Sequence, residues 1–347
     1  MILAPGINIK RSPLCGRNFE YMSEDPYLTG ELAVPLIQGI QTKDTAACVK
    51  HFALNNQETE RLWVDVKVSE RALYEIYLPA FEKAVKKGKT MSIMGAYNRY
   101  KGQHCCENKE LMTDILRGKW GFDGMSVSDW GAVHNTTEVA AGGLDIEMSV
   151  TDNFDEYFMA ESLKKAVENG EIPECLIDEK IQNIIRMLFR LHKMGEGDRN
   201  PGSYNAQEHR ETVLGAARES VVLLKNEDKK LPLSQKETRK VLVIGDNGDR
   251  IHSNGGGSAE IKALYEISPL MGIKKLLGGN AQVVYAKGYF AEEKTVRYSE
   301  GIFVGYRYYD TEHKKVHRFV TEFGTYQIYA GKSVENICCE AEIDLKL

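Results

Sequence analysis

Short apolar runs alternate with amphipathic stretches through the first half of the chain, as they do in parallel α/β proteins. Four of these runs predict strands, at 46–52, 90–97, 124–129 and 143–148. Elsewhere apolar positions recur every three or four residues and predict helices, over 69–87, 107–118, 154–169 and 174–194. Because crossovers between parallel strands place their helices on the outer face, this pitch favours a parallel sheet closed as a barrel.

The pattern changes near residue 195. The stretch 196–206 consists of Gly, Pro and mostly polar residues, which predicts a linker. A helix over 207–219, the apolar run 221–226 and a strand over 240–245 predict the start of a second α/β domain. The last part, 318–347, alternates in the manner of antiparallel strands. The pattern therefore predicts a barrel over 1–195, a second α/β domain that begins at 207, and β strands within 318–347.

Composition and charge narrow the class of protein. Hydrophobic residues make up 42% and charged residues 27% of the chain, which is typical of a folded globular protein. The net charge of −5 argues against nucleic acid as a partner. No apolar run is long enough to span a bilayer, and the first residues lack the pattern of a signal peptide. We therefore expect a cytoplasmic protein without nucleic-acid or membrane partners, and leave homo-oligomerisation open.

The cysteines and histidines predict no metal centre. Seven cysteines occur, an odd number without a CxxC pair, so the sequence indicates neither a disulfide framework nor a zinc knuckle. His313 and His317 are four residues apart, but no third ligand accompanies them. We expect reduced thiols, no metal and no cofactor.

Polar groups stand at the ends of three predicted strands: Lys50-His51, Tyr97-Asn98 and Asp129-Trp130. In a (β/α) barrel the working groups sit at the carboxyl ends of the strands. A carboxylate beside an indole suits a sugar, because the ring stacks on the aromatic face while the carboxylate meets C1. Lys50 and His51 can then donate hydrogen bonds to the hydroxyls of the sugar ring.

Each of these residues also has a plainer interpretation. A single strand-end Asp is more often a cap or turn residue, and Trp130 alone fits packing. Lys50 and His51 alone fit a solvated pair, and Met94 fits a core residue better than a ligand contact. The residues taken singly therefore decide little.

Several motifs in a fixed order along the chain say more about function than the single residues do. The strings KRSPLCGRNFEYMSEDP (10–26), KHFALNNQE (50–58) and GFDGMSVSDW (121–130) resemble the β-glucosidases of glycoside hydrolase family 3. So do ARESVVLLKNEDKKLPL (217–233) and KVLVIGDNGD (240–249). The resemblance runs from near residue 1 to near residue 345. It implies a partial (β/α)8 TIM-like barrel over 1–195 without its N-terminal strands, a linker over 196–206, an α/β sandwich domain with an internal gap over 207–310, and the end of a fibronectin type III-like domain over 311–347.

The same resemblance implies roles for individual residues. Asp129 matches the catalytic nucleophile of the SDW motif and implies a retaining mechanism through a covalent glycosyl-enzyme. The other implied contacts to the terminal glucose are Arg17, Lys50, His51, Tyr97, Trp130 and Met94. The expected substrate is a β-glucoside or a short β-gluco-oligosaccharide.

The chain also departs from the family pattern. The upstream part that supplies the first barrel strands and a substrate-binding Asp is not seen. The motif that carries the general acid/base Glu is missing after 286–295, and Glu292, Glu293 and Glu300 lack its surroundings. We therefore leave the acid/base unassigned and expect poor turnover of unactivated glycosides, because general acid catalysis contributes about 10²–10⁴-fold.

Three alternatives accompany this prediction. A non-catalytic sugar-binding remnant would keep the binding residues without the acid. A β-xylosidase or another β-glycosidase specificity would keep the chemistry but change the sugar. A nucleotide site is disfavoured, because the glycines at 255–257 come too late for a phosphate-binding turn after the strand over 240–245.

Overall fold

A computed structural model describes residues 1–195, 202–251, 261–288, 324–328 and 341–345. The chain divides into two compact units, Met1–Ala216 and Ala217–Leu347. None of the helices among these residues is long and apolar enough to cross a membrane. The five cysteines that the structure describes, Cys15, Cys48, Cys105, Cys106 and Cys175, are free thiols.

The first unit is built on a parallel sheet with the order β1 (Cys48–Phe52), β3 (Ser92–Gly95), β6 (Met125–Val127). Parallel bridges extend it on both sides: Ile2 and Gly6 pair beside β1, and Ile146 pairs with Val127. Spatial order follows chain order, as in the predicted barrel arrangement. The predicted strands at 46–52, 90–97 and 124–129 are confirmed, whereas the run 143–148 contributes only the bridge at Ile146.

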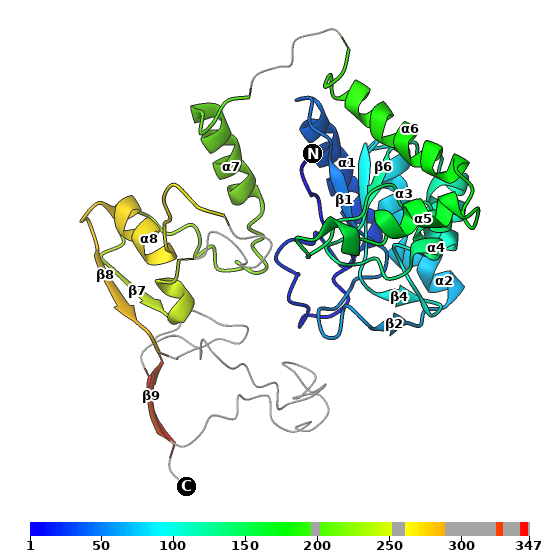
Figure 1. Ribbon diagram of the computed structural model, residues 1–347. Helices are drawn as coiled ribbons and strands as arrows, with labels where there is room; N and C mark the ends of the chain where they lie inside the picture. Colours follow the sequence, from blue (N-terminus) through cyan, green and yellow to red (C-terminus); the bar gives the residue numbers. More distant parts are fainter. Residues whose placement is uncertain (196–201, 252–260, 289–323, 329–340, 346–347) are drawn as a thin grey trace. The chain divides into compact units, whose positions relative to one another are not determined.

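Helices flank this sheet in the first unit (Figure 1). They are α1 (Pro26–Gln41), α2 (Glu70–Ala72), η1 (Leu73–Tyr77), α3 (Pro79–Lys86), η2 (Glu110–Lys119), α4 (Thr136–Gly142), η3 (Phe154–Glu156), α5 (Glu161–Glu168) and α6 (Cys175–Arg190). Phe52 of β1 meets Phe81 of α3 and Trp120 edge to face, with ring centroids 5.3 and 5.7 Å apart. These rings lie in the main core between sheet and helices.

The helix predicted over 69–87 is present but interrupted. Ser69 caps it as expected, accepting a hydrogen bond from the backbone N–H of Ala72. A π-helical turn, η1, then separates α2 from α3. Pro79 begins α3 and has no N–H to donate to the preceding turn, which accounts for the break. The pattern also did not predict α1, although Asp25 caps it and Pro26 stands at its first position.

A small second sheet covers the carboxyl end of β3. It has the order β2 (Asp65–Val66), β4 (Arg99–Tyr100), β5 (Gln103–His104), and β4 and β5 form a tight hairpin. The hairpin turns the chain back, so that the backbone N–H of Cys105 donates a hydrogen bond to the Asn98 carbonyl.

Asp145 fastens β6 to the elements around it. Its buried carboxylate accepts hydrogen bonds from the backbone N–H of Ser126 (2.7 Å) and the Ser126 hydroxyl (3.0 Å). The Arg117 guanidinium of η2 donates at 2.6 Å, and the Asn183 amide of α6 donates at 2.9 Å. The strand that ends next to Asp129 is therefore tied to two helices through one carboxylate.

The second unit contains a parallel pair, β7 (Lys240–Ile244) and β8 (Gln282–Ala286), with α8 (Pro269–Leu277) and the short helix η4 (Asp246–Gly248). The predicted helix is found as α7 (Gln207–Glu219), and the predicted strand over 240–245 is confirmed. The run 221–226 forms no strand, and its apolar side chains are exposed. Near the end, β9 (Gly324–Ile328) and β10 (Ala341–Leu345) pair antiparallel, as the alternation predicted.

Candidate functional site at the end of the parallel strands

Asp129 follows β6 in a turn that the neighbouring chain fixes. Ser128 donates its backbone N–H to the Ile146 carbonyl at 2.9 Å, and its hydroxyl accepts from the Met148 N–H at 2.7 Å. Gly131 has a φ of 68°, a left-handed conformation that glycine adopts without strain. The strand direction and this turn place the Asp129 side chain at the carboxyl end of the sheet.

The two oxygens of Asp129 have different surroundings. Oδ1 accepts a hydrogen bond from the backbone N–H of Trp130 at 2.9 Å. Oδ2 is buried and has no hydrogen-bond partner among the described residues. His51 Nε2 lies 3.6 Å from Oδ2. A buried carboxylate oxygen without a partner is costly in a folded protein, and Glu58 Oε1 is a second such oxygen among the described residues.

Burial raises the pKa of the Asp129 carboxyl above its ordinary value. The hydrogen bond from Trp130 opposes this shift most strongly, followed by the Tyr97 hydroxyl. The positive charges of Arg17 and Arg61 also oppose it. The group is therefore desolvated and surrounded by donors and cations, which suits a carboxylate that reacts as a nucleophile.

His51 is held from both sides by residues distant in sequence. The Asn8 side chain accepts from the His51 N–H at 2.7 Å and donates to the His51 carbonyl at 2.9 Å. The Tyr21 hydroxyl lies 3.3 Å from His51 Nδ1. Burial, and then the nearby cations, lower the pKa of His51 well below its ordinary value. A neutral imidazole therefore points its Nε2 at Asp129.

The predicted cations are joined by a carboxylate that the sequence did not single out. Glu20 Oε1 lies 2.5 Å from Arg17 Nε, and its Oε2 lies 3.4 Å from Lys50 Nζ. The Arg17 and Lys50 side chains are largely buried. Glu20 therefore fixes both cations near the histidine, and its only sequence signal is its place inside the string 10–26.

Arg61 is a second addition from the structure. Its guanidinium lies 4.9 Å from the centre of the Tyr97 ring and forms an ion pair with Glu58. Burial, and then the charge of Asp129, raise the pKa of the Tyr97 hydroxyl, so this group stays protonated. Arg61 lies only three residues beyond the KHFALNNQE string, yet the residues alone gave no reason to choose it.

The remaining predicted residues differ in exposure. Trp130 is 43% exposed beside Asp129, as an aromatic wall of a sugar site requires. Met94 is buried in a cluster with Cys48, Met125 and Val127. The structure thus favours the core interpretation of Met94, and a contact with a ligand stays a prediction.

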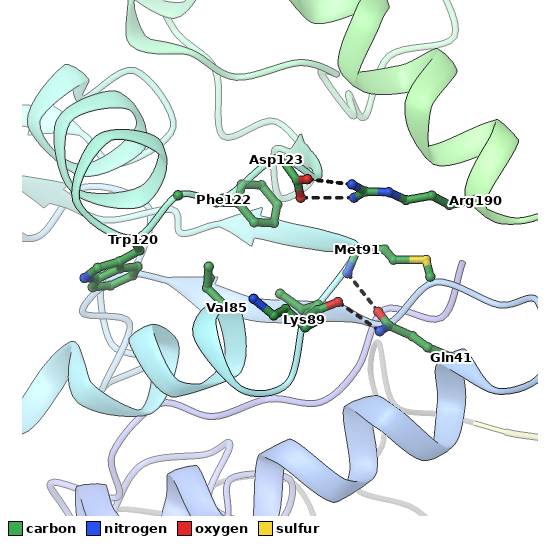
Figure 2. A pocket seen from close by; sticks show the side chains of 10 residues that line it. Gln41, Val85, Lys89, Met91, Trp120, Phe122, Asp123 and Arg190 are labelled. Atoms are coloured by element: carbon green, nitrogen blue, oxygen red, sulfur yellow. Dashed lines mark hydrogen bonds and ion pairs between the residues drawn. The ribbon is translucent and has the colours of Figure 1, made fainter.

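A separate cavity of about 300 Å³ lies at the other end of the strands (Figure 2). Its lining comes from segments that precede β3 and β6, together with Gln41, Val85 and Arg190. Gln41 bonds the Lys89 carbonyl and the Met91 N–H, and Arg190 pairs with Asp123 through two contacts. None of the predicted site residues lines this cavity.

The described residues contain no group of three or more His, Cys, Asp or Glu that could hold a metal ion. Glu292, Glu293, Glu300, His313 and His317 lie outside the described residues. The structure therefore brings together Arg17, Lys50, His51, Tyr97 and Asp129, and adds Asn8, Glu20, Tyr21 and Arg61 around them.

Comparison with known proteins gives consistent matches. The sequence is 48% identical over 304 residues to β-glucosidase BoGH3A of Bacteroides ovatus, covering 83% of this chain and 40% of that protein. It is 41% identical over 292 residues to thermostable β-glucosidase B of Acetivibrio thermocellus, covering 84% and 38%. It is 43% identical over 270 residues to an exo-α-(1→6)-L-arabinopyranosidase of Bifidobacterium longum, covering 75% and 34%. The chain thus spans about two fifths or less of the length of these relatives.

Solved structures agree with these matches. β-Glucosidase 3B of Thermotoga neapolitana, solved with α-D-glucose, superposes with a TM-score of 0.72 at 40% identity, covering 82% of this chain and 39% of that one. The β-glucosidase of Kluyveromyces marxianus, solved with glucose, gives a TM-score of 0.75 at 36% identity, covering 84% and 35%.

Family profiles match both units. The profile described as the glycosyl hydrolase family 3 N terminal domain matches residues 1–187, and that of the C-terminal domain matches residues 221–314. Because the first match alone covers more than half of the sequence, the chain belongs to glycosyl hydrolase family 3.

Proposed function

We propose that this protein acts as a retaining β-glucosidase that removes terminal, non-reducing β-D-glucosyl residues, with Asp129 as the nucleophile. One observation carries the proposal: Asp129 Oδ2 is buried, lacks a hydrogen-bond partner among the described residues, and lies 3.6 Å from His51. The β-glucosidase relatives and the glucose-bound neighbours support the choice of sugar.

In the proposed reaction, Asp129 Oδ2 attacks C1 of the glucosyl residue while the bond from C1 to the leaving oxygen breaks. The departing alkoxide takes a proton from solvent. Water later attacks C1 from the other side and releases a proton to solvent, the bond to Asp129 breaks, and glucose leaves with retained configuration. Arg17, Lys50 and His51 would bind sugar hydroxyls, since His51 lies beside the Asp129 carboxylate and Glu20 joins Arg17 to Lys50. Trp130 would supply the face on which the sugar ring stacks.

No described residue is assigned as the general acid. An unprotonated alkoxide is a poor leaving group, so the missing proton costs most where the leaving alcohol is least acidic. Aryl glucosides with acidic phenols should therefore react with this chain better than cellobiose-type substrates.

We also propose the finer fold that family membership suggests. The parallel order β1-β3-β6, extended by bridges on both sides, is compatible with part of a (β/α)8 barrel. The β9–β10 pair would belong to a fibronectin type III-like domain, and β7 and β8 to an α/β sandwich. The boundaries at 195, 206 and 310 stay predictions.

A different sugar specificity is the second candidate. The arabinopyranosidase relative is as similar in sequence to this chain as the second of the β-glucosidases compared above. Arabinopyranose and xylopyranose lack the C6 hydroxymethyl group of glucose, so the choice depends on contacts to that group.

Trapping tests both candidates. The full chain is incubated with 2-deoxy-2-fluoro-β-D-glucosyl fluoride and, separately, with the corresponding xylosyl fluoride. The bond from Asp129 to C1 forms while the bond between C1 and its fluorine breaks. Fluoride leaves without needing an acid, and the fluorine at C2 stays on the sugar. We expect a glucosyl adduct on the peptide that contains Asp129, seen by mass spectrometry.

The matched control is Asp123→Asn, which removes an ion pair at the opposite strand ends and should keep the adduct. Faster labelling by the xylosyl reagent would favour the second candidate. A folded chain that forms no adduct with either reagent would support the non-catalytic remnant. Retention is checked by NMR on an aryl glucoside, where the β-anomer should form first.

A further inference from the structure

A small aromatic stack next to the backbone of Tyr97 consists of two face-to-face imidazoles, His104 and His134, and the indole of Trp63, whose plane is inclined by 47° to His134 and 76° to His104. His104 and His134 lie face to face, with ring centroids 3.9 Å apart and planes inclined by 30°. Trp63 contacts both rings, with its centroid 5.5 Å from His134 and 6.1 Å from His104. Exposure increases along the stack: His104 is 9% exposed, His134 is partly buried and Trp63 is 54% exposed.

Hydrogen bonds hold the main chain at Trp63 and His134 and the ring of His104. The Trp63 carbonyl accepts two hydrogen bonds from the Arg99 guanidinium, at 3.0 and 2.6 Å. The His134 N–H donates to the buried Glu107 carboxylate. His104 Nδ1 lies 3.0 Å from the Tyr97 carbonyl. The exposed indole therefore projects from a held backbone and packs against two rings, which limits the freedom it would lose when it binds a ring.

The two imidazoles can stack because neither is charged. Burial is the main cause that lowers the pKa of His104 and of His134, and Arg99 lowers both further. The two uncharged imidazoles therefore pack without charge repulsion, and Trp63 meets them at an angle.

All three segments also form the candidate site. Trp63 comes two residues after Arg61, whose guanidinium covers the Tyr97 ring. His104 bonds the backbone of Tyr97, and His134 comes five residues after Asp129 in the same loop. The stack is thus joined to the candidate site through the contact of His104 with the Tyr97 carbonyl and through the short chain segments from Arg61 to Trp63 and from Asp129 to His134.

We propose that Trp63, supported by His134 and His104, binds the ring of the leaving group, whether an aryl ring or a second sugar, and so selects glucosides that carry such a ring. This inference rests on the proposed function, because a leaving group is defined only by attack at Asp129. A solvent-exposed indole packed against other rings beside a polar site is typical of sites that bind rings, and it adds selectivity where the hydroxyl contacts cannot.

The test compares two ligands that differ only in the ring. Phenyl 1-thio-β-D-glucoside and methyl 1-thio-β-D-glucoside resist cleavage, and calorimetry gives the affinity of the full chain for each. We expect the phenyl compound to bind about five- to tenfold more tightly, as expected for one added aromatic contact. Trp63→Ala should abolish this ratio, and Trp63→Phe should retain part of it. Phe189→Ala, which removes an exposed aromatic ring from α6, should leave the ratio unchanged.

The outcomes separate this inference from the proposed function. If the methyl compound binds and Asp129 is trapped, but the phenyl advantage is absent or survives Trp63→Ala, the platform role is wrong and the proposed function stands. If neither compound binds and no adduct forms, both are wrong. Circular dichroism of Trp63→Ala should match the parent chain, and Trp63→Phe provides the same comparison if the alanine variant misfolds.

Discussion

Two buried aspartates are attached to the same strand and differ in how their oxygens are satisfied. Asp145 accepts hydrogen bonds from two groups of Ser126, from Arg117 and from Asn183. Asp129 accepts one bond at Oδ1 and has a buried oxygen without a partner among the described residues. The first arrangement stabilises the fold, and the second holds a carboxylate in readiness for a substrate.

The comparison shows that burial alone does not identify a functional acid. Both side chains are almost fully buried, Asp145 at 1% and Asp129 at 6% exposure. What separates them is the number of donors that reach each carboxylate. The predictions below therefore alter one aspartate or the other and ask whether chemistry or stability changes.

The largest effect should follow the loss of the Asp129 carboxylate. Asp129→Ala should lower the rate of aryl β-glucoside hydrolysis by about 10⁴-fold or more and abolish the fluoroglucosyl adduct, since no other described carboxylate lies free beside His51. Initial rates with a nitrophenyl glucoside measure this. Unchanged activity in Asp129→Ala would exclude Asp129 as nucleophile.

The next effect should be on stability. Asp145→Ala removes the acceptor of four donors and leaves the partly buried Arg117 charge without its partner, so we expect a loss of about 3–5 kcal/mol in the free energy of unfolding. Denaturant unfolding of the full chain measures it, followed by probes in the first unit. Asp123→Ala breaks the more exposed ion pair with Arg190 and should cost about 0.2–1 kcal/mol. Equal losses in the two variants would contradict a special role of the Asp145 network.

Lys180 offers a pH test near Asp145. Its ammonium donates to the Ala140 carbonyl at 3.0 Å, and burial lowers its pKa from 10.5 to about 8. Between these two values the unfolded chain binds the proton more tightly than the folded chain, so this group makes stability rise with pH. The rise should amount to a few kcal/mol at most. Lys180→Met should lose it, as seen by comparing unfolding at pH 7.5 and pH 10 for both proteins.

The smallest effect concerns Asp129, whose titration should make stability fall with rising pH, opposite to the effect of Lys180. Because burial raises the pKa of this carboxyl, the folded state binds its proton more tightly, and stability falls as pH rises from 3.8 through the raised pKa. Asp129→Asn does not titrate and should be about 0.5–2 kcal/mol more stable than the parent chain at pH 7. The gain should vanish below pH 3.8. A loss of stability at pH 7 would mean that the cations around Asp129 outweigh its burial.

The sequence predicted the residues at the strand ends well, because the apolar spacing that predicts a strand and the motif that follows it lie within a few residues of each other. Lys50, His51, Tyr97 and Asp129 come at the ends of predicted strands and meet in the structure. Glu20, Asn8 and Arg61 could not be chosen in this way. Their contacts depend on loops that return to the sheet, and a single charged residue in a loop has no periodic signal.

Local chemistry also explains the errors in the secondary structure. Pro79 interrupts a stretch whose apolar spacing continues through it, and the spacing alone predicts one helix. The run 221–226 has strand composition but no partner strand among the described residues, and it stays exposed. A strand is stable only when a neighbour accepts its hydrogen bonds, and composition does not report that neighbour.

The hydrogen bonds between Asn8 and His51 have a consequence for the order of folding. Asn8 and His51 are separated by 43 residues, and Tyr21 and His51 by 30. Such distant contacts form after local helices, because closing a long loop costs entropy before any contact rewards it. The imidazole would therefore be aligned late, when residues 1–21 settle onto β1. Sugar binding would then report the completion of folding more faithfully than helix content does.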